Sequence, residues 1–469
     1  MRWIAAVLFG LMTTMAFAQE SWVHADFRRE SERVKDACSF HSFMSVGGCA
    51  YTLFTDHPLH IAAGSMPPQN GFGLGLAYVA TRNTENWRLS WDVDAVGATS
   101  ASWRAGGYLK LIHTPVPAVQ VSMPGSGGSS SKSKKHGVQV HPFTVYNLYA
   151  QAIALNKLNY FGLGNDTSLL GGSVFGMTQT IIGGNVTKPV FELPALSKLN
   201  LSLFGEMNGR FVNIRGEGGQ SSPSIQFLYD DVTAPGLSHQ PGFLQFGQGV
   251  RIKPVIGDHL ELNYSGSLQE FVAPSSSQNT FERWTLDLNH TFYLYGYTQS
   301  GPKTGTMTGP DECAPSGGKC PEVSHSRNLN GSIGVRLLIS ESMNSPSKVP
   351  FYFQQTIGGQ DINSSLVLPS YRDYRFRAPN FLLLEENFEH SIWGPFGLKF
   401  MADQGRVALT RDDVGFSHLK HSFAAGLTLR AGGFPMVQMM FAWGGPEGHH
   451  NIFGMNTSLL GGGARPRLD

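Results

Sequence analysis

The chain contains few charged residues and, beyond its first fifteen residues, no long apolar run. Charged residues make up 15% of the 469 residues, against about 25% in a typical soluble domain. A membrane-spanning helix needs about 20 mostly apolar residues, and no such stretch follows Met15. These absences exclude a helical membrane protein and disfavour an ordinary soluble domain.

Glycine and aromatic residues are abundant instead. The chain has 56 Gly and 11% aromatic residues, yet its mean hydropathy is only −0.13. This combination fits a surface that is divided between lipid and a wet lumen. The net charge of +1 argues against a nucleic-acid-binding protein, because that function needs a strongly basic surface.

The first 18 residues read as a secretory signal peptide. Arg2 supplies the positive start, residues 3–15 are apolar, and Ala16-Phe17-Ala18 is a small-residue cleavage site. The residue that follows is Gln19 rather than cysteine, which disfavours a lipoprotein anchor.

Four cysteines fall into two local pairs, Cys38 with Cys49 and Cys313 with Cys320. Close spacing and export to an oxidising compartment predict two structural disulfides. Metal binding is the rival interpretation, but neither pair has the two-residue spacing of a zinc knuckle.

The main signal beyond the leader is a strict alternation of apolar and polar residues. Between Arg283 and Leu294, for example, Trp284, Leu286 and Leu288 share one face, whereas Thr285 and Asp287 share the other. Side chains of a strand point alternately to its two faces, so these segments are strands with one apolar side. A soluble β-sandwich also alternates, but these segments are longer than the usual 5 to 6 residues and carry aromatic residues near their ends.

The sequence therefore predicts an all-β protein, a transmembrane antiparallel β-barrel of about sixteen strands. An even number of strands is typical of a single-chain bacterial barrel. The expected strands are 71–82, 86–99, 103–113, 138–154, 173–188, 199–215, 242–256, 258–271, 280–298, 327–342, 349–357, 380–392, 395–409, 418–431, 434–446 and 449–460.

The remaining segments complete the expected domain organisation. Residues 19–70 form a short N-terminal segment with an amphipathic helix from Asp26 to Cys38, which plugs the mouth, lies inside the barrel or caps its surface. The barrel extends over 71–460, and 461–469 is a flexible polar tail. Two long connections, 114–137 with its lysines and 300–326, are expected as surface loops, the first of them extracellular.

Five motifs stand out along the chain: Tyr160-Phe161-Gly162-Leu163-Gly164-Asn165-Asp166, Ser222-Pro223-Ser224-Ile225, Ala234-Pro235-Gly236-Leu237, Leu368-Pro369-Ser370-Tyr371-Arg372-Asp373-Tyr374-Arg375-Phe376-Arg377 and Met401-Ala402-Asp403-Gln404-Gly405-Arg406-Val407. These motifs resemble those of the BamA/TamA-type bacterial surface-antigen barrels, a family whose long sixth extracellular loop folds back into the lumen. The similarity covers most of residues 57–460. In this family an Arg-Gly-aromatic loop tip is received by an aromatic-x-Asp-x-Gly strand.

The chain departs from this family pattern at the loop tip. Pro369-Ser370 stands where Arg-Gly is expected, and Met401 replaces the aromatic residue before Asp403. The resemblance implies a lumen-loop site at Tyr371, Arg372, Asp373, Tyr374, Arg375 and Arg377, with Asp403 and Gly405 as its acceptor. Since a guanidinium in a semi-wet lumen needs an acceptor, Arg372, Arg375 or Arg377 is expected to pair with Asp403, and Arg372 is the nearest candidate. Members of the family also carry periplasmic POTRA domains, which residues 19–70 are too short to form.

Catalytic motifs are missing from the sequence. It contains no Gly-x-Ser-x-Gly elbow, no His-Glu-x-x-His and no phosphate-binding glycine loop. His449 and His450 are adjacent and would face opposite sides of a strand, so they are poor joint metal ligands. We therefore expect no enzyme activity, no cofactor and no metal site.

The resemblance implies that the protein inserts or translocates protein or lipid across a Gram-negative outer membrane. Strand glycine weakens pairing, so Gly71, Gly73, Gly75 and Gly461 to Gly463 predict a weak seam between the first and last strands. Expected partners are outer-membrane lipids, lipopolysaccharide and nascent outer-membrane proteins, and the barrel is expected to be a monomer. The alternative is a passive channel or structural surface protein that uses the same barrel.

Overall fold

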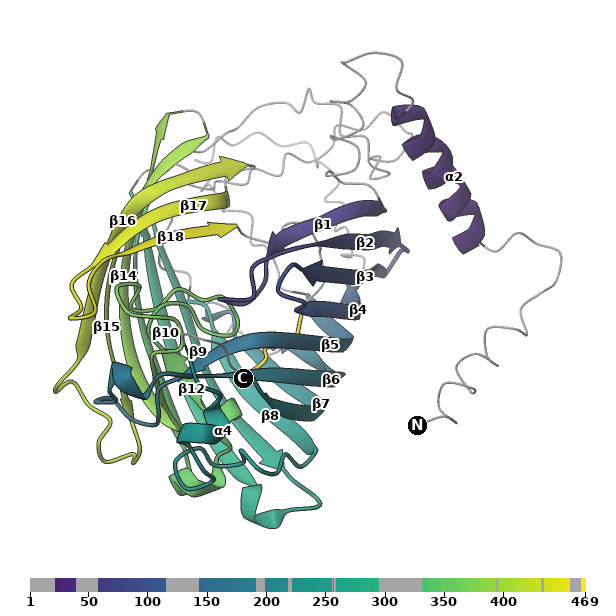
Figure 1. Ribbon diagram of the computed structural model, residues 1–469. Coiled ribbons are helices and arrows are strands. Elements are labelled where there is room, and N and C mark those ends of the chain that lie inside the picture. Colours follow the sequence, from purple (N-terminus) through teal and green to yellow (C-terminus); the bar gives the residue numbers. More distant parts are fainter. Residues whose placement is uncertain are drawn as a thin grey trace.

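The computed structural model is a nearly closed antiparallel β-barrel with a loop folded into its lumen (Figure 1). Its description covers residues 22–38, 58–114, 143–190, 199–217, 222–254, 256, 259–294, 331–393, 395–431, 434–455 and 465–469. Within these ranges no helix is both long and apolar enough to cross a membrane.

Sixteen strands form one sheet in which each strand pairs with its neighbours along the chain, apart from two short strands inside the lumen. The barrel strands are β1 (Leu59–Ser65), β2 (Phe72–Asn83), β3 (Trp87–Ala98), β4 (Trp103–His113), β5 (Thr144–Tyr160), β6 (Ser173–Pro189), β7 (Ser202–Gly216), β8 (Phe243–Ile252), β9 (Leu260–Val272), β10 (Phe281–Tyr293), β11 (Gly331–Ser342), β14 (Asn380–Trp393), β15 (Phe396–Ala408), β16 (Lys420–Ala431), β17 (Phe434–Trp443) and β18 (His450–Met455). The predicted fold class is confirmed.

Both sets of strands number sixteen, but two strands are assigned differently and β5 begins and ends six residues later than the expected 138–154. The first strand is β1, which begins at Leu59, so the barrel starts before the expected residue 71. Residues 349–357, expected as a membrane strand, instead form a 3-10 turn (Phe351–Phe353) and the short strand β12 (Gln355–Ile357). The Phe-Tyr-Phe run is apolar because it is buried inside the lumen, where it does not face lipid.

The two faces of the wall follow the predicted alternation. Arg283 is buried on the lumen side of β10. Phe292, which is an odd number of residues away and so faces the other side of the strand, is exposed on the outside. On β17, Met439 and Phe441 are likewise exposed, and Met440 between them is buried. Outward apolar and inward polar residues are the pattern of a barrel that spans a bilayer.

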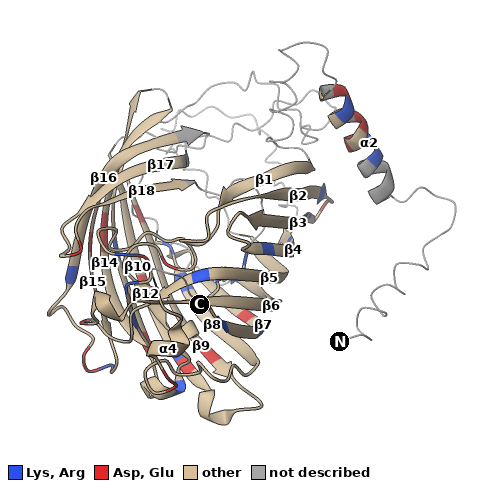
Figure 2. Ribbon diagram, in the orientation of Figure 1, with Lys and Arg blue, Asp and Glu red and all other residues tan. Residues whose placement is uncertain are grey.

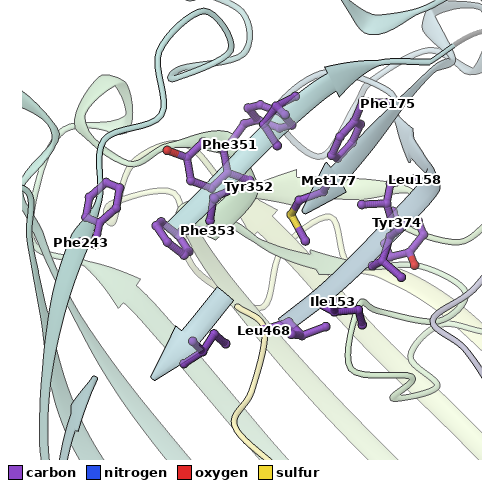
Figure 3. Close-up of a cluster of buried hydrophobic side chains, with 14 of the residues drawn as sticks. Ile153, Leu158, Phe175, Met177, Phe243, Phe351, Tyr352, Phe353, Tyr374 and Leu468 are labelled. Atoms are coloured by element: carbon purple, nitrogen blue, oxygen red, sulfur yellow. The ribbon is translucent and has the colours of Figure 1, made fainter. Parts of the chain in front are cut away.

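The segment between β11 and β14, residues 343–379, is called the lumen loop here. It contains β12 and β13 (Phe376–Ala378), which pair with each other only. Phe351 and Phe353 of this loop pack against the lumen sides of β5, β6 and β8 to β10, and Figure 3 shows this aromatic cluster. The lumen loop thus provides much of the barrel's interior core.

The N-terminal helix is α2 (Trp22–Ala37), which begins four residues before the expected Asp26. In Figure 1 it lies outside the outline of the barrel, and Figure 2 shows charges of both signs on its surface. Cys49, Cys313 and Cys320 lie outside the described residues, so both disulfides stay predictions.

Residues Arg465–Asp469, called the luminal segment here, lie inside the barrel; the end of the chain marked C in Figure 1 is there. Leu468 is 6% exposed and belongs to the interior core, and the Asn363 amide of the lumen loop donates to Asp469 at 2.7 Å. The expectation of a flexible polar tail is therefore wrong for these five residues. Burial of Leu468 and pairing of the charged side chains hold them in place.

Successive strands run in opposite directions, so successive connections lie at opposite ends of the barrel. The connection from β4 to β5 therefore lies at the end opposite to the lumen loop, as does that from β10 to β11. Segments 114–137 and 300–326 fall in these two connections, mostly outside the described residues. The lumen loop and residues 114–137 therefore cannot both be extracellular, although both were expected on that side from the sequence.

The alternation can be tested with a matched pair of substitutions on β10. Leu288→Lys places a charge on the outward face near the middle of the strand, and we expect a loss of about 2–4 kcal/mol of unfolding free energy. Asn289→Lys places the same charge on the lumen side and should cost much less. Urea unfolding in lipid vesicles measures both, and equal losses would contradict the assigned faces.

Candidate functional site

The motifs that carry the family resemblance meet around the lumen loop, although they are far apart in the sequence. The Gly164 amide of the first motif donates to the Arg377 carbonyl at 2.8 Å. Gly164 has a φ of +108°, which favours glycine at this position. In another motif, the Pro235 carbonyl accepts from the Phe351 amide at 2.8 Å. The candidate site is therefore this end of the lumen, organised by the loop.

Arg375 is the central cation of the site. It forms a buried ion pair with Glu447 of the β17–β18 connection, and both side chains are 5% exposed. Its other nitrogens donate to the hydroxyl and the carbonyl of Thr167, each at 2.6 Å. The guanidinium also lies 5.0 Å from the ring centre of Phe161 and 4.6 Å from that of Phe376. Arg375 thus joins the lumen loop to two other connections at the same end.

Arg377 holds the lumen loop onto itself. Its side chain donates to the carbonyls of Phe351 at 2.7 Å and Gln354 at 3.3 Å. Burial lowers the pKa of Arg377 to about 10, which still leaves the guanidinium charged at neutral pH.

The expected ion pair between Arg372 and Asp403 does not form. Asp403 Oδ2 accepts a hydrogen bond from the backbone amide of Leu368 at 2.9 Å. The Arg372 side chain is exposed, and along the described residues no ion pair connects it to Asp403. The loop tip lacks the arginine of the family motif, and a main-chain donor takes its place.

The neighbouring positions of the loop tip are also fixed by polar contacts. The Ser370 amide donates to the Ser422 hydroxyl of β16 at 2.8 Å, and the Ser370 hydroxyl accepts from Gly445 at 3.0 Å. Tyr371 packs edge-on against Phe376. A Cβ at Gly405 would come within 3.1 Å of Ile357 in β12, so this glycine makes room for the loop.

Tyr374 and Arg375 are consecutive residues that contact opposite sides of the gap between β1 and β18. The Tyr374 hydroxyl donates to the Pro68 carbonyl in the β1–β2 connection at 3.2 Å, whereas Arg375 binds Glu447 next to β18. Asp373 accepts from the Gln360 amide at 2.9 Å, and burial raises the pKa of Asp373. The lumen loop therefore connects the two edges of the barrel at this end.

The gap itself is the second part of the site. Within the described residues, β1 and β18 share no hydrogen-bonded ladder, whereas all other neighbours in the sheet do. The glycines expected at the seam are placed differently: Gly73 and Gly75 lie in β2, which pairs on both sides, with β1 and with β3. A Cβ at Gly75 would clash with the Ala95 carbonyl at 1.8 Å, so close strand approach explains this glycine. Gly461 to Gly463 lie outside the described residues.

Several residues of the site were not expected from the sequence. Glu447 and Thr167 lie in short connections, where nothing in the local pattern distinguishes a buried partner from an exposed polar residue. Arg283 shares the polar face of the predicted strand with Thr285 and Asp287. Its hydrogen bond to the Phe353 carbonyl at 3.1 Å, however, depends on the fold of the loop. In the described part of the chain, no cluster of three metal-ligating side chains occurs.

The fold and the site define a transmembrane β-barrel with an inward-folded loop and an unpaired edge. No family model and no curated protein matches the chain. Solved structures similar to it include CdiB from Acinetobacter baumannii, with 9% identity, a TM-score of 0.44 and coverage of 86% of this chain and 58% of that chain. CdiB from Escherichia coli has 10% identity, a TM-score of 0.46 and coverage of 83% and 59%. This chain thus spans less than two thirds of either CdiB chain.

A third similar structure is BamA from Haemophilus ducreyi lacking POTRA domains 1-3. It has 10% identity, a TM-score of 0.41 and coverage of 85% of this chain and 68% of that chain. These values are too low to transfer a residue role or an activity to this chain.

Two arginines of the lumen loop should differ sharply in their contribution to stability. Arg375→Ala leaves Glu447 buried without its partner, and we expect a loss of about 3–5 kcal/mol. Arg372→Ala removes an exposed side chain and should leave the unfolding free energy nearly unchanged. Denaturant unfolding of the refolded barrel distinguishes them. If Arg372→Ala is the more damaging change, the assigned contacts are wrong.

Asp361 of the lumen loop should make stability depend on pH. Burial, and then the nearby Asp469, raise the pKa of Asp361 to about 7. The folded state therefore holds this proton when the unfolded chain has lost it, so stability falls as the pH rises from about 4 through 7. We expect the unfolding temperature to rise between pH 8 and pH 5, and Asp361→Asn to reduce this rise. An unaltered pH dependence in the variant would contradict the assignment.

Proposed function

We propose that this protein is an outer-membrane barrel of the surface-antigen type that inserts or translocates protein or lipid, using the seam between β1 and β18. The observation that carries this proposal is the edge itself, where no ladder joins the two strands along their described residues. In lipid, unpaired backbone groups are costly. An edge that stays unpaired inside a membrane is therefore suited to an incoming strand or lipid.

The length of the first edge strand supports this proposal. β1 has 7 residues, whereas β5 and β6 have 17 each. Fewer main-chain groups need to be satisfied at a short edge, so separating it from its neighbour costs less than opening any other position of the sheet.

The filled lumen argues against the alternative of a passive channel. The lumen loop contacts the inner faces of β15 and β16 through Leu368 and Ser370. The luminal segment occupies further space beside β3 and β4. Since a passive pore needs an open path, we expect small and irregular conductance in planar bilayers. Large, steady single-channel currents would favour the channel instead.

The proposal includes a location and partners. The apolar outer face fits a bilayer, and the expected leader would export the chain from the cytoplasm, so we propose the outer membrane of a Gram-negative cell as its location. We propose nascent outer-membrane proteins or lipids as substrates, surrounding lipids and lipopolysaccharide as contacts, and a monomeric barrel. No enzymatic step, cofactor or nucleic acid is part of this proposal.

Locking the seam tests the function directly. Ala63→Cys on the outward face of β1 is combined in turn with Asn451→Cys and Phe453→Cys on the outward face of β18. We expect the crosslinked barrel to lose the ability to complement a deletion strain, as measured by outer-membrane protein and lipid levels, and a reductant to restore it. Full complementation by a crosslinked seam would contradict the proposal.

The matched control places the same crosslink in a ladder that is already paired. Phe441 of β17 and Asn451 of β18 are direct partners, so Phe441→Cys with Asn451→Cys should leave complementation intact. Each single-cysteine variant controls for pairing with the natural cysteines.

A further inference from the structure

The luminal segment Arg465–Asp469 makes contacts that resemble those of a bound ligand. It belongs to no strand or helix, and side chains from the wall and the lumen loop hold it. Leaving its place would therefore break none of the ladders of the barrel. The described residues of the segment begin after a stretch, 456–464, that lies outside the description.

The basic end of the segment is bound at β3 and β4. Arg465 forms an ion pair with Asp94, and its guanidinium lies 5.6 Å from the ring centre of Tyr108. Asp94 is 2% exposed and also pairs with Arg104 at 3.2 Å. A buried carboxylate beside an aromatic ring is a recognition site for a guanidinium.

The acidic end of the segment is also paired. Asp469 is 8% exposed and forms an ion pair with Arg467 of the same segment at 3.2 Å. Two arginines of the wall, Arg210 and Arg283, are 1% and 3% exposed, and along the described residues neither forms an ion pair with a carboxylate of the wall. Because buried positive charge is costly without a counter-charge, this interior favours a segment that carries an acidic side chain.

Asn363 of the lumen loop fixes the register of the segment. Its Oδ1 accepts from the Leu468 amide at 2.9 Å, while its Nδ2 donates to the Asp469 carboxylate at 2.7 Å. Leu468 itself is buried in the same apolar cluster as Ile153 and Tyr374, which Figure 3 labels. The barrel thus recognises one main-chain amide, one apolar side chain and two opposite charges of the segment. Such a combination is typical of a peptide-binding site.

We propose that the barrel lumen contains a peptide-binding site whose resident ligand is the luminal segment. The site accepts an extended peptide with an arginine at one position, an apolar residue three positions later and an acidic residue four positions later, as in Arg465, Leu468 and Asp469. A peptide of this pattern from another chain competes with Arg465–Asp469 and displaces it from the lumen. This inference goes beyond the proposed function and holds whether or not the seam opens.

The test uses a full-length variant in which the luminal segment no longer binds, so that the site is empty. Arg465→Glu repels Asp94, and Leu468→Ser removes the apolar anchor. The double variant is refolded in detergent micelles and titrated with a fluorescently labelled Arg-Pro-Arg-Leu-Asp peptide by anisotropy. We expect the peptide to bind this variant at least tenfold more tightly than the unaltered protein, whose site is occupied.

Two controls establish specificity. The charge-reversed peptide Glu-Pro-Glu-Leu-Lys should bind at least tenfold more weakly to the vacated barrel. Adding Asn363→Ala or Asp94→Asn to the vacated barrel should weaken the first peptide about tenfold, whereas Asp412→Asn, in an exposed connection, should have no effect. Heat-modifiable migration on gels confirms that each variant is folded.

A chain that lacks residues 465–469 serves as a second vacated protein, so the result does not depend on the folding of one variant. Equal affinity for vacated and unaltered barrels, equal binding of the two peptides, or no binding to a folded vacated barrel would overturn the proposal. Transport is not measured, so failure here is distinguishable from failure of the seam crosslink.

Discussion

The requirement that every backbone amide and carbonyl in lipid be hydrogen-bonded governs this structure. It forces the sheet to curve until its edges approach each other, and it explains why outward positions such as Leu288 are apolar while inward positions bear charge. It also makes the one pair of edges without a ladder the most consequential place in the molecule. The lumen loop contacts both of these edges, through Tyr374 and Arg375.

The period-two pattern was sufficient to predict the class of fold and most strand positions, because burial on one face imposes alternation directly. It failed at Leu59–Ser65 and at residues 349–357. β1 is short and carries small residues, so its pattern is weak. The Phe-Tyr-Phe run is equally apolar whether it faces lipid or the interior, and only tertiary structure distinguishes the two environments.

The site was predictable in outline but not in its pairings. The sequence motifs indicated that a loop near Tyr371 meets the strand of Asp403, and the Leu368 amide does so. Which arginine is buried could not be predicted, because Arg372 and Arg375 each follow a tyrosine in the same loop. The choice depends on Glu447, which lies 72 residues away from Arg375. The luminal segment was missed for a similar reason: its charged residues resemble an exposed tail until Asp94 and Asn363 are placed beside them.

The adjacent contacts of Tyr374 with Pro68 and of Arg375 with Glu447 have a geometric consequence. They restrain both margins of the barrel at one rim, whereas no comparable tie joins the described residues near Leu59 and Met455 at the other rim. Any separation of the margins would then proceed as a wedge, with its apex at the restrained rim and its widest part at the opposite one. An incoming strand or lipid would then enter the opening from the side of the membrane at which the edges separate most, and the restrained rim would determine which side that is.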